Sequence, residues 1–569
     1  LHSYTESSVL ASGKFVKVKV VESGIYKLTH EAIRNMGVDP ANVRVFGYGG
    51  ALLEQDFSKP KFDDLPEVTL YQGSDYILFY GQGITKWSYS SDKRMFTHTL
   101  NHYAKEGYYF ITSDAGTGKK IQDETGTVPS DAETTLINEF VDYKVHEVEK
   151  INLGKTGKVF YGEEFTSKLS YDFPFSFPNL TSADIKVRID VAAISTENSS
   201  FDLSLSNTTR SISVLRLGND RYEIGKDANV VLSFPSTGTH NLTFNLKYNK
   251  ANAASRGYLN YLTINARRKL QMTGSALFFR NTDNLDTSVY NKYQISGAGA
   301  NVQVWDITDP INIKKIATNR TGDVIEFTAS NDGVKEYVAI DPTAKAAFTL
   351  EPATVGTVAN QNLHGLANAD MVIITHPSFA AQAEKLAAAH REKDNLSVNI
   401  VTTEQVYNEF SSGTPDATAY RWVMKMFYDR AQQNPGAHTM PKYLLLFGRG
   451  TFDNRGLIPN SGDNLVLTYQ ADQSLHLVQS YVTDDYFGFL DNSEGTNLTS
   501  HMIDLGIGRF PTVTPQQAED VVNKTIAYMK NDIKGNWKNQ LTFLADDGDD
   551  SLHIGQADGI AQSLFATNP

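Results

Sequence analysis

The sequence predicts a multidomain chain, with N-terminal antiparallel β domains of the sandwich or jelly-roll type followed by part of an α/β domain with a parallel sheet. Two patterns predict this order. Up to about residue 345, short runs of alternating polar and apolar residues are separated by Gly, Asn, Asp and Ser, as in antiparallel sheets. After about residue 350, fully apolar short runs alternate with long amphipathic segments, which is typical of a parallel sheet covered by helices on both faces.

The β part divides into two predicted domains, 1–115 and 116–345. A polar stretch with few strand-forming residues opens at Asp114 and gives the boundary between them. Regular turns between many short strands favour a sandwich or a jelly roll. The clearest strands are predicted at 15–20, 76–80, 185–191, 201–205, 229–234 and 240–246.

The third predicted domain, 346–569, is the α/β part. Ser378 is predicted to cap its first helix, and Thr514 with Gln517 to form a capping box at its third. A doubly wound domain usually has five or six strands, so we expect this domain to be incomplete and the chain to be a piece of a longer protein. Strands are predicted at 371–375, 397–401, 443–447, 505–508 and 541–544, and helices at 379–391, 417–432, 515–530 and 559–566.

The composition excludes several kinds of chemistry. The 569 residues include no cysteine, which excludes disulfides, Cys-type zinc sites, iron–sulfur clusters and a cysteine nucleophile within this chain. With 52 Lys and Arg against 65 Asp and Glu, the formal charge is −13, so nucleic acid is not expected as a partner. No apolar run approaches the roughly 20 residues of a membrane-spanning helix. The polar sequence after Leu1 indicates that a signal peptide is absent or has been removed.

Polar residues follow the predicted parallel strands, at the edge where open α/β sheets bind their ligands. His376 follows the first strand, the segment 448–453 follows the third, and an Asp-rich segment with His553 follows the strand at 541–544. Carboxylates in this position could orient an imidazolium, bind a cation or hold a basic substrate side chain. An Asp-rich turn taken alone favours solvated caps and turns instead.

Three further segments have a functional and a structural interpretation. Asp484, Asp485 and Tyr486 form either a packed turn or a loop that lines a substrate or holds calcium. The Gly-Arg-Gly sequence around Arg449 predicts a loop that lets the backbone approach a substrate or an ion. His364 precedes the first parallel strand in a predicted linker, and we assign it a structural role.

Ordered motifs in both halves of the chain carry a resemblance. In the α/β part they are Tyr-Leu-Leu-Leu-Phe-Gly at 443–448, Thr-Asp-Asp-Tyr-Phe-Gly at 483–488, Asp-Leu-Gly-Ile-Gly-Arg-Phe-Pro at 504–511, and Trp537 with Ala-Asp-Asp-Gly-Asp at 545–549. In the β part they lie at 23–28, 44–50, 75–80, 101–103, 109–110 and 258–270. The first set resembles the catalytic domain of gingipain-type cysteine peptidases, which has a caspase-like fold. The second set is similar to the gingipain-like sortases of the Bacteroidetes type IX secretion system.

The resemblance implies a cell-surface cysteine peptidase and transpeptidase, attached to the outer membrane of a Gram-negative bacterium and exported with a signal peptide that is removed. Such a sortase cleaves the C-terminal signal domain from secreted cargo and transfers the new carboxyl end to anionic lipopolysaccharide. The implied partner is an outer-membrane β-barrel of the secretion system. No cofactor is implied as a requirement, and calcium is a candidate ion.

The resemblance also implies roles for single residues. The catalytic histidine and cysteine would lie beyond Pro569, so the chain by itself is expected to be inactive. Asp547 matches the acid that orients the catalytic histidine, although this family has Glu there and the neighbouring Asp546 is a second candidate. His553 matches the specificity carboxylate of Arg-cleaving gingipains, so a preference for Arg or Lys at P1 is not expected. Asp546 and Asp549 are candidate calcium ligands.

Two alternatives stay open. A general secreted gingipain-like endopeptidase would share the α/β part but should lack the long β part, so residues 1–115 favour the sortase. A non-catalytic β-rich surface or adhesion protein with a degenerate peptidase domain is also compatible with these 569 residues.

Overall fold

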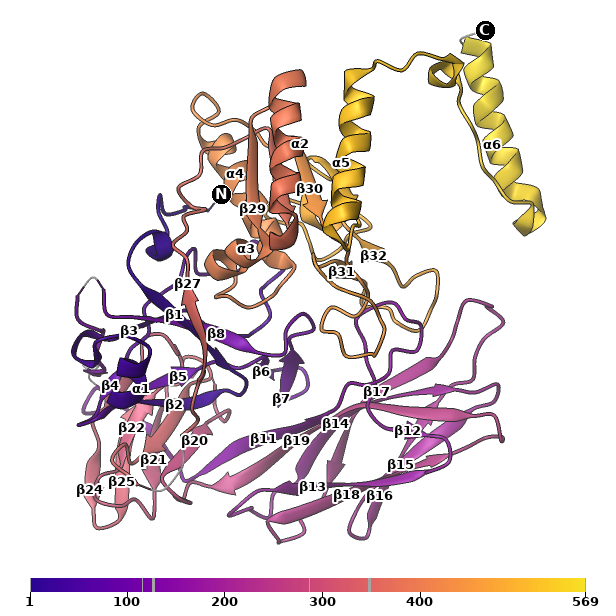
Figure 1. Ribbon diagram of the computed structural model, residues 1–569. Helices are drawn as coiled ribbons and strands as arrows, with labels where there is room; N and C mark the ends of the chain where they lie inside the picture. Colours follow the sequence, from indigo (N-terminus) through magenta and orange to yellow (C-terminus); the bar gives the residue numbers. More distant parts are fainter. Residues whose placement is uncertain (1, 115, 125–127, 286, 346–348, 568–569) are drawn as a thin grey trace. The chain divides into compact units, whose positions relative to one another are not determined.

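A computed structural model describes residues 2–114, 116–124, 128–285, 287–345 and 349–567. The chain forms two compact units, Leu1–Ala518 and Glu519–Pro569 (Figure 1). The predicted domain boundaries fall on Ala115 and Ala346, which lie outside the described residues. Within the described ranges, no helix has both the length and the apolar character needed to cross a membrane.

The N-terminal residues form antiparallel strands, as predicted. In the first strand Val16, Val18 and Val20 are buried while Lys17 and Lys19 are partly exposed, which is the period-two pattern of a strand with one face on the core. Sheets have the orders β27-β1-β8-β3 and β2-β5-β4, beside a β6-β7 hairpin. The elements are β1 (Phe15–Val20), β2 (Gly24–Thr29), α1 (His30–Asn35), β3 (Arg44–Phe46), β4 (Tyr71–Gln72), β5 (Tyr76–Gly81), β6 (Thr85–Ser90), β7 (Met95–Leu100), β8 (Gly107–Thr112) and β27 (Ala353–Val358).

Two antiparallel sheets then pack as a sandwich, with orders β11-β19-β14-β17 and β13-β18-β15-β16. The strict alternation of buried and exposed residues in β15 and β18 places one face of each strand in a shared core that includes Phe201, Phe244 and Ile189. The strands predicted here are confirmed. Their bounds are β11 (Glu139–Glu147), β12 (Glu164–Phe165), β13 (Ser170–Ser176), β14 (Ile185–Ile194), β15 (Ser199–Leu205), β16 (Thr208–Val214), β17 (Lys226–Phe234), β18 (Asn241–Asn249) and β19 (Arg256–Lys269).

The predicted domain 116–345 holds a second β substructure beyond this sandwich. It consists of sheets β10-β21-β25-β24 and β20-β26-β22-β23-β9, which bury their own core around Phe279 and Tyr337. Its strands are β9 (Gln122–Asp123), β10 (Thr134–Ile137), β20 (Ala276–Arg280), β21 (Tyr290–Ile295), β22 (Gln303–Asp306), β23 (Lys314–Ile316), β24 (Asn319–Thr321), β25 (Val324–Ala329) and β26 (Glu336–Ile340).

The α/β part contains a parallel sheet of order β29-β28-β30-β33, which confirms the predicted class. Its strands β28 (Met371–Thr375) and β30 (Tyr443–Phe447) are almost entirely buried because helices and loops cover both faces. The other elements are α2 (Ala380–Lys393), β29 (Val398–Thr402), α3 (Thr403–Phe410), α4 (Thr418–Gln433), β31 (Tyr469–Gln470), β32 (Val482–Thr483), β33 (Gly506–Phe510) and α5 (Pro515–Lys530).

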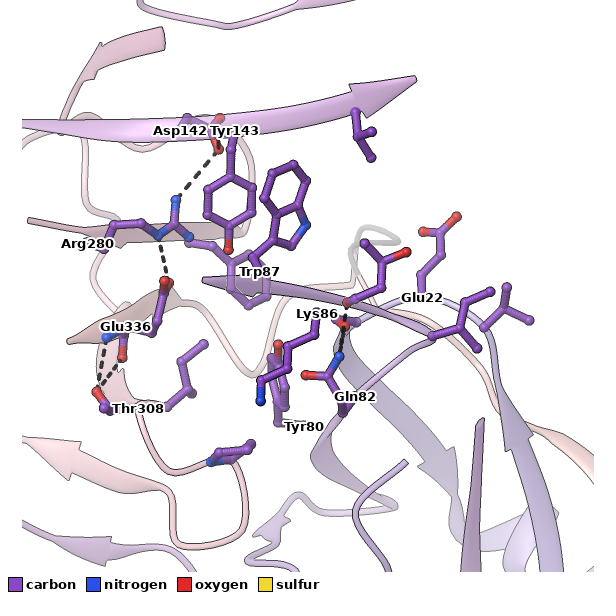
Figure 2. A pocket seen from close by; sticks show the side chains of 18 residues that line it. Glu22, Tyr80, Gln82, Lys86, Trp87, Asp142, Tyr143, Arg280, Thr308 and Glu336 are labelled. Carbon is purple, nitrogen blue, oxygen red and sulfur yellow. Dashed lines mark hydrogen bonds and ion pairs between the residues drawn. The ribbon is translucent and has the colours of Figure 1, made fainter. Parts of the chain in front are cut away.

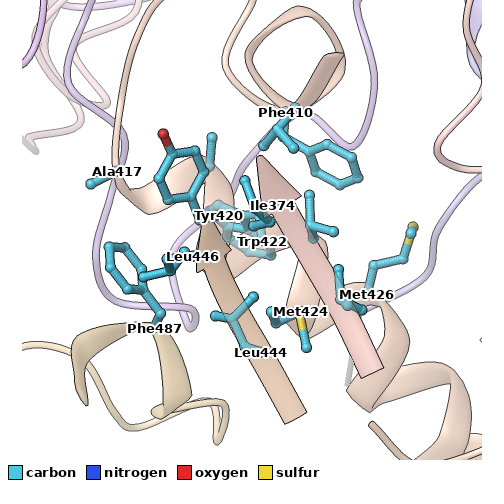
Figure 3. Close-up of a cluster of buried hydrophobic side chains, with 14 of the residues drawn as sticks. Ile374, Phe410, Ala417, Tyr420, Trp422, Met424, Met426, Leu444, Leu446 and Phe487 are labelled. Carbon is cyan, nitrogen blue, oxygen red and sulfur yellow. The ribbon is translucent and has the colours of Figure 1, made fainter. Parts of the chain in front are cut away.

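Helix α4 is buried on nearly every side rather than amphipathic. Its apolar residues, among them Trp422 and Met426, pack on Ile374 and Leu446 of the sheet (Figure 3). Its polar face is covered as well, since the side chain of Arg421 donates to the backbone carbonyls of Gln55 and Phe489. The helix therefore joins the sheet to the N-terminal residues and to the loop before β33.

Two predicted caps differ in the structure. Ser378 does not cap α2. A 3₁₀ turn at Pro377–Phe379 precedes the helix, and the ring of His376 caps that turn by accepting from the Ser378 N–H at 3.3 Å. At α5, Thr514 accepts from the Gln517 N–H as predicted, but the Gln517 side chain accepts from the N–H of Val513, one residue before the cap.

The strand β27 lies after the predicted boundary at 346 but pairs with the first β domain. It pairs antiparallel with β1 through Phe15↔Val358 to Lys19↔Ala353, and the Lys27 N–H donates to the Leu350 carbonyl. The segment that leads into the α/β part thus completes the first β sheet, because β1 would otherwise leave an edge unpaired.

The unit Glu519–Pro569, described by itself, contains the end of α5, a 3₁₀ turn at Asn536–Asn539 and α6 (Gly548–Thr567). The strand predicted at 541–544 is wrong: these residues have no regular structure, and Leu541 and Leu544 are 72% and 98% exposed. A strand needs a hydrogen-bonded neighbour, and residues 519–567 offer no second extended strand within their own unit. The predicted helix at 559–566 is confirmed and starts earlier.

Candidate functional site

The carboxyl ends of the parallel strands are level with one another. The last paired residues are Thr375, Phe447 and Phe510, which stand side by side in β28, β30 and β33. The ladder continues for one residue, because the N–H of His376 donates to the Phe447 carbonyl and the N–H of Gly448 donates to the Phe510 carbonyl. The polar residues that follow these strands therefore meet at one edge, as predicted from sequence.

His376 is the only imidazole directly following a described strand of this sheet. It is partly buried, and burial lowers its pKa, with a smaller opposing effect from the carboxylate of Glu404. The ring is therefore neutral near pH 7 and its Nδ1 accepts hydrogen bonds from Ser378. This arrangement caps the following turn and leaves Nε2 without a partner among the described residues.

The Gly-Arg-Gly loop after β30 is filled by the chain itself. A Cβ at Gly448, whose φ is +152°, would lie 2.5 Å from the Val466 side chain, and a Cβ at Gly450 would lie 2.3 Å from Thr468. The two glycines admit the segment 465–468 against the loop, and Arg449 N–H donates to the Thr512 carbonyl. The glycines therefore make room for the segment 465–468, and not for the substrate or ion predicted to approach this backbone.

Arg509 organises the same edge from β33. Its guanidinium donates to both carboxylate oxygens of Asp484, at 2.7 and 2.8 Å. It also donates to the carbonyls of Gly448, Val466 and Leu467 at 2.8–2.9 Å. Such a bidentate pair with all remaining donors satisfied fixes its partners in position. Asp484, predicted as a substrate-binding residue, is thereby the anchor of the loop before β33.

The other residues of this predicted substrate loop divide between core and surface. Tyr486 is fully buried, stacks on Tyr469 with ring centroids 4.3 Å apart, and exchanges a 2.9 Å hydrogen bond with the Thr418 hydroxyl. The packed-turn interpretation thus describes Tyr486, whose side chain has no accessible surface for a substrate. Asp485 is exposed, and its role in substrate binding stays a prediction.

Asp453, at the end of the loop after β30, is also structural. It is completely buried and accepts from the N–H groups of Leu457 and Ile458 and from the hydroxyl of Ser461, at 2.7–2.9 Å. In the 453–461 loop, these three hydrogen bonds to the carboxylate take the place of the backbone hydrogen bonds of a regular turn.

The remaining predicted residues lie in the unit Glu519–Pro569. Asp546 and His553 line one shallow hollow of about 420 Å³, together with Leu544 and Ile560. The Nε2 of His553 lies 3.6 Å from the carboxylate of Asp549, and both side chains are half exposed. Asp547 is exposed and does not line this hollow. The assignments of Asp547 as the orienting acid and of His553 as the specificity residue stay predictions.

Calcium does not fit the residues predicted to bind it. Asp546 and Asp549 are both exposed, and the described part of the chain contains no group of three His, Asp or Glu side chains that could hold a metal ion. Because Ca²⁺ takes six to eight oxygen ligands, two exposed carboxylates beside an imidazole make a poor site.

Asp484 and the Gly-Ile-Gly-Arg-Phe motif are separate features of the sequence, and their link through Arg509 was not predicted. A cavity between the β substructures was not predicted either, and its lining residues lie as far apart in the sequence as Val21 and Glu336. No local sequence signal marks either feature, since both depend on the tertiary fold.

Comparison with known proteins gives a family match and a strong structural match. Residues 364–569 match the model of peptidase family C25. The structure of dimeric latent PorU from Porphyromonas gingivalis is similar with a TM-score of 0.84 and 30% sequence identity, over 97% of this chain and 52% of the PorU chain. This chain thus spans about half the length of that protein. No curated protein matches the chain.

Several further structural similarities are weak. The CBM36-1 domain of a xylanase from the hindgut metagenome of Trinervitermes trinervoides has a TM-score of 0.16 and 15% identity, over 22% of this chain and 96% of that domain. A score this low supports no argument. The PorU match, in contrast, agrees with the β-rich front and the parallel sheet described above. Residues 364–569 are therefore similar to peptidase family C25, and the chain is PorU-like over nearly its whole length.

Proposed function

We propose that this chain is the N-terminal part of a cell-surface transpeptidase that removes the C-terminal signal domain from type IX secretion cargo and attaches the cargo to anionic lipopolysaccharide. The observation that supports this most is the match to PorU across the β-rich front as well as the peptidase part. A gingipain-like endopeptidase without such a front would match only the second half.

The proposed chemistry is nucleophilic catalysis by a thiolate. A histidine takes the proton of the cysteine thiol, the thiolate attacks the scissile carbonyl, and the acyl-enzyme is resolved by an amine of the acceptor instead of water. The 569 residues contain no cysteine, so the nucleophile would come from residues outside this chain. The chain would contribute the scaffold of the site, which is formed by the residues at the carboxyl ends of β28, β30 and β33.

We assign Asp547 to the acid that orients the catalytic histidine, and the test is a substitution in the full-length protein. Asp547→Asn should lower kcat for cleavage of a cargo protein roughly a hundredfold or more, because a neutral amide cannot stabilise the imidazolium. Asp550→Asn, an exposed neighbour in the same segment, is the matched control and should keep wild-type activity. Equal activity of the Asp547→Asn variant would contradict the assignment.

We further propose that His553 stands where Arg-cleaving relatives carry a carboxylate, so the enzyme should lack a trypsin-like preference. A panel of fluorogenic peptides with different P1 residues, applied to the full-length protein, measures this. Cleavage after Arg at a rate comparable to that of a gingipain would overturn the proposal.

We also propose a partner and a location for this protein. We propose attachment to the outer-membrane surface through a PorV-like β-barrel, after export with a signal peptide that is removed, and activity without a cofactor. Surface proteolysis of intact cells and co-purification with the barrel test the location. Activity in the presence of EDTA tests the independence from calcium.

One experiment distinguishes this function from the alternatives. Full-length protein is incubated with a cargo protein that bears its C-terminal signal domain and with a primary amine. Release of the signal domain with the amine attached to the cargo supports the transpeptidase, hydrolysis alone supports an endopeptidase, and an intact cargo supports a non-catalytic surface protein.

A further inference from the structure

A cavity of about 630 Å³ lies where the first β sheets meet the sandwich and the second β substructure (Figure 2). Its walls come from β5 and β6, from the start of β11, and from β20, β26 and the loop near Thr308. Cavities of this size at the junction of substructures are where small ligands commonly bind. None of its residues belongs to the carboxyl edge of the parallel sheet.

The buried charges around this cavity are paired, and Glu22 adds an exposed carboxylate to its lining. Arg280, whose side chain is 3% exposed, donates to Glu336 at 2.7 Å and lies 3.7 Å from Asp142. Asp142 is also held by Arg268 at 2.6 Å. At the mouth, Lys86 lies 3.7 Å from Glu54. Because each buried charge has an opposite charge beside it, the buried walls of the cavity give no net attraction to a strongly anionic or cationic ligand.

Several polar atoms of the lining residues nevertheless have no hydrogen-bond partner among the described residues and are free to meet a ligand. The hydroxyl of Tyr143, the indole N–H of Trp87 and one terminal nitrogen of Arg280 make no hydrogen bond with the described part of the chain. The side-chain carbonyl of Gln82 accepts none either, while its amide nitrogen donates to Ser23 and to two backbone carbonyls. Burial raises the pKa of Tyr143, so its hydroxyl stays a donor at physiological pH.

The ring of Tyr143 has no open face toward the cavity. Trp87 stacks on one face of Tyr143, with centroids 4.1 Å apart and planes at 22°, and the Arg280 guanidinium lies 4.4 Å over the Tyr143 ring. Figure 2 shows these rings at one wall, with Tyr80 and Gln82 opposite. Since Tyr143 is covered on both sides, it cannot hold a cation against its face, and its exposed chemistry is the hydroxyl.

From this geometry we propose that the cavity binds a neutral saccharide unit, with Tyr143, Trp87, Arg280 and Gln82 as its hydrogen-bonding residues. Sugar hydroxyls donate and accept, which matches the mixed set of free donors and acceptors. The apolar C–H surface of a sugar ring suits the walls formed by Ile84, Phe278 and Ile307. The proposal is independent of the peptidase function, and the 569-residue chain suffices to test it.

The test is binding of neutral sugars to the 569-residue chain. Glucose, galactose, mannose, xylose and N-acetylglucosamine, with their disaccharides, are titrated by calorimetry and by tryptophan fluorescence. At least one should bind saturably. Tyr143→Phe should weaken its Kd about tenfold, the loss expected for one well-placed hydrogen bond, and Trp87→Phe should abolish the fluorescence response. Both variants keep the stacked aromatic pair, and thermal unfolding verifies that they fold.

Trp537→Phe is the matched control, because Trp537 is exposed and does not line the cavity. It should bind as the wild type does. Absence of binding by every sugar, or binding that Tyr143→Phe leaves unchanged, would overturn the proposal. Saturable binding of arginine amide or lysine amide in place of sugars, sensitive to Tyr143→Phe, would also overturn it and indicate a site for basic side chains.

Discussion

The imidazole of His364 and the carboxylate of Glu409 form a 2.6 Å hydrogen bond in which both side chains are completely buried. The other ring nitrogen of His364 lies 3.2 Å from the carboxylate of Asp63. Glu409 also accepts from the N–H groups of Leu363 and His364 and from Gln361. This buried imidazolium therefore ties the loop around Asp63, in the N-terminal β part, to helix α3 of the peptidase part.

We predict that this contact makes stability depend on pH. Burial alone would lower the pKa of His364, but the hydrogen bonds that it donates to Asp63 and Glu409 raise this pKa from 6.5 to about 9. Because its pKa is raised in the folded state, His364 stabilises the protein fully below pH 6.5. This contribution is lost as the pH rises to about 9. Its size is on the order of 3 kcal/mol. Urea unfolding of the wild type and of Glu409→Gln between pH 6 and 9.5 measures it.

The informative quantity is the difference in the free energy of unfolding between the wild type and Glu409→Gln. Burial lowers the pKa values of Lys17 and Lys61 to about 8, so these groups change stability with pH in the opposite direction. Glu409→Gln should lose more stability at pH 6 than at pH 9.5. A gap between wild type and Glu409→Gln that stays constant with pH would contradict the prediction.

A second buried pair, Lys425 with Asp429 in α4, should be costly to break on one side only. The two side chains are 2.7 Å apart and fully buried, and Asp429 also accepts from the Tyr4 hydroxyl at 3.0 Å. Lys425→Met leaves the carboxylate without a countercharge and should cost about 3–5 kcal/mol. Chemical denaturation of the 569-residue chain measures this.

The double variant Lys425→Met with Asp429→Asn separates charge from packing. It removes both charges while the amide oxygen can still accept from Tyr4, so it should be more stable than Lys425→Met alone. Lys442→Met, at an exposed pair with Asp370, should cost much less than Lys425→Met. A double variant less stable than the single one would show that the charge is not the cause.

The sequence predicted the class of each half because hydrophobic periodicity is a local property. The alternation in β1 and β18 and the apolar runs of β28 and β30 reflect which faces are buried. The structure confirms the strands predicted from them. The strand predicted at 541–544 has the same kind of apolar run. It failed because a run of apolar residues says nothing about whether a neighbouring strand is present to pair with it.

The roles of polar residues were harder to predict because they depend on distant partners. Tyr486 belongs to a motif of acids and aromatics that suggests a binding loop, yet its hydroxyl meets Thr418 in the core. His364 meets carboxylates 45 and 301 positions away. A single sequence contains the residue types but not these separations in space.

We predict that Arg509→Lys loosens the carboxyl edge of the sheet. A lysine ammonium cannot reproduce the bidentate pair with Asp484 or reach the carbonyls of Val466 and Leu467 together. The expected cost is about 2–3 kcal/mol. Hydrogen exchange should rise at 465–468 and 482–484, whereas Arg391→Lys, at an exposed pair with Glu384, should leave exchange there unchanged. Unchanged protection in Arg509→Lys would show that packing alone holds this edge.

The close packing of the loop after β30 yields a last prediction at Gly450. A methyl group there would lie 2.3 Å from Thr468 Cγ2 and 2.7 Å from the Val466 carbonyl, so the backbone must move, and Gly450→Ala should cost about 1–3 kcal/mol. Gly508→Ala in β33 is the matched control, since its methyl group would meet only Leu445 at 3.8 Å, and it should be neutral or slightly stabilising. Adding Thr468→Ser to Gly450→Ala removes the clashing methyl group and should recover part of the loss in urea unfolding. If Gly450→Ala is as stable as the wild type, the segment 465–468 is free to withdraw, and the loop would then be open to a ligand after all.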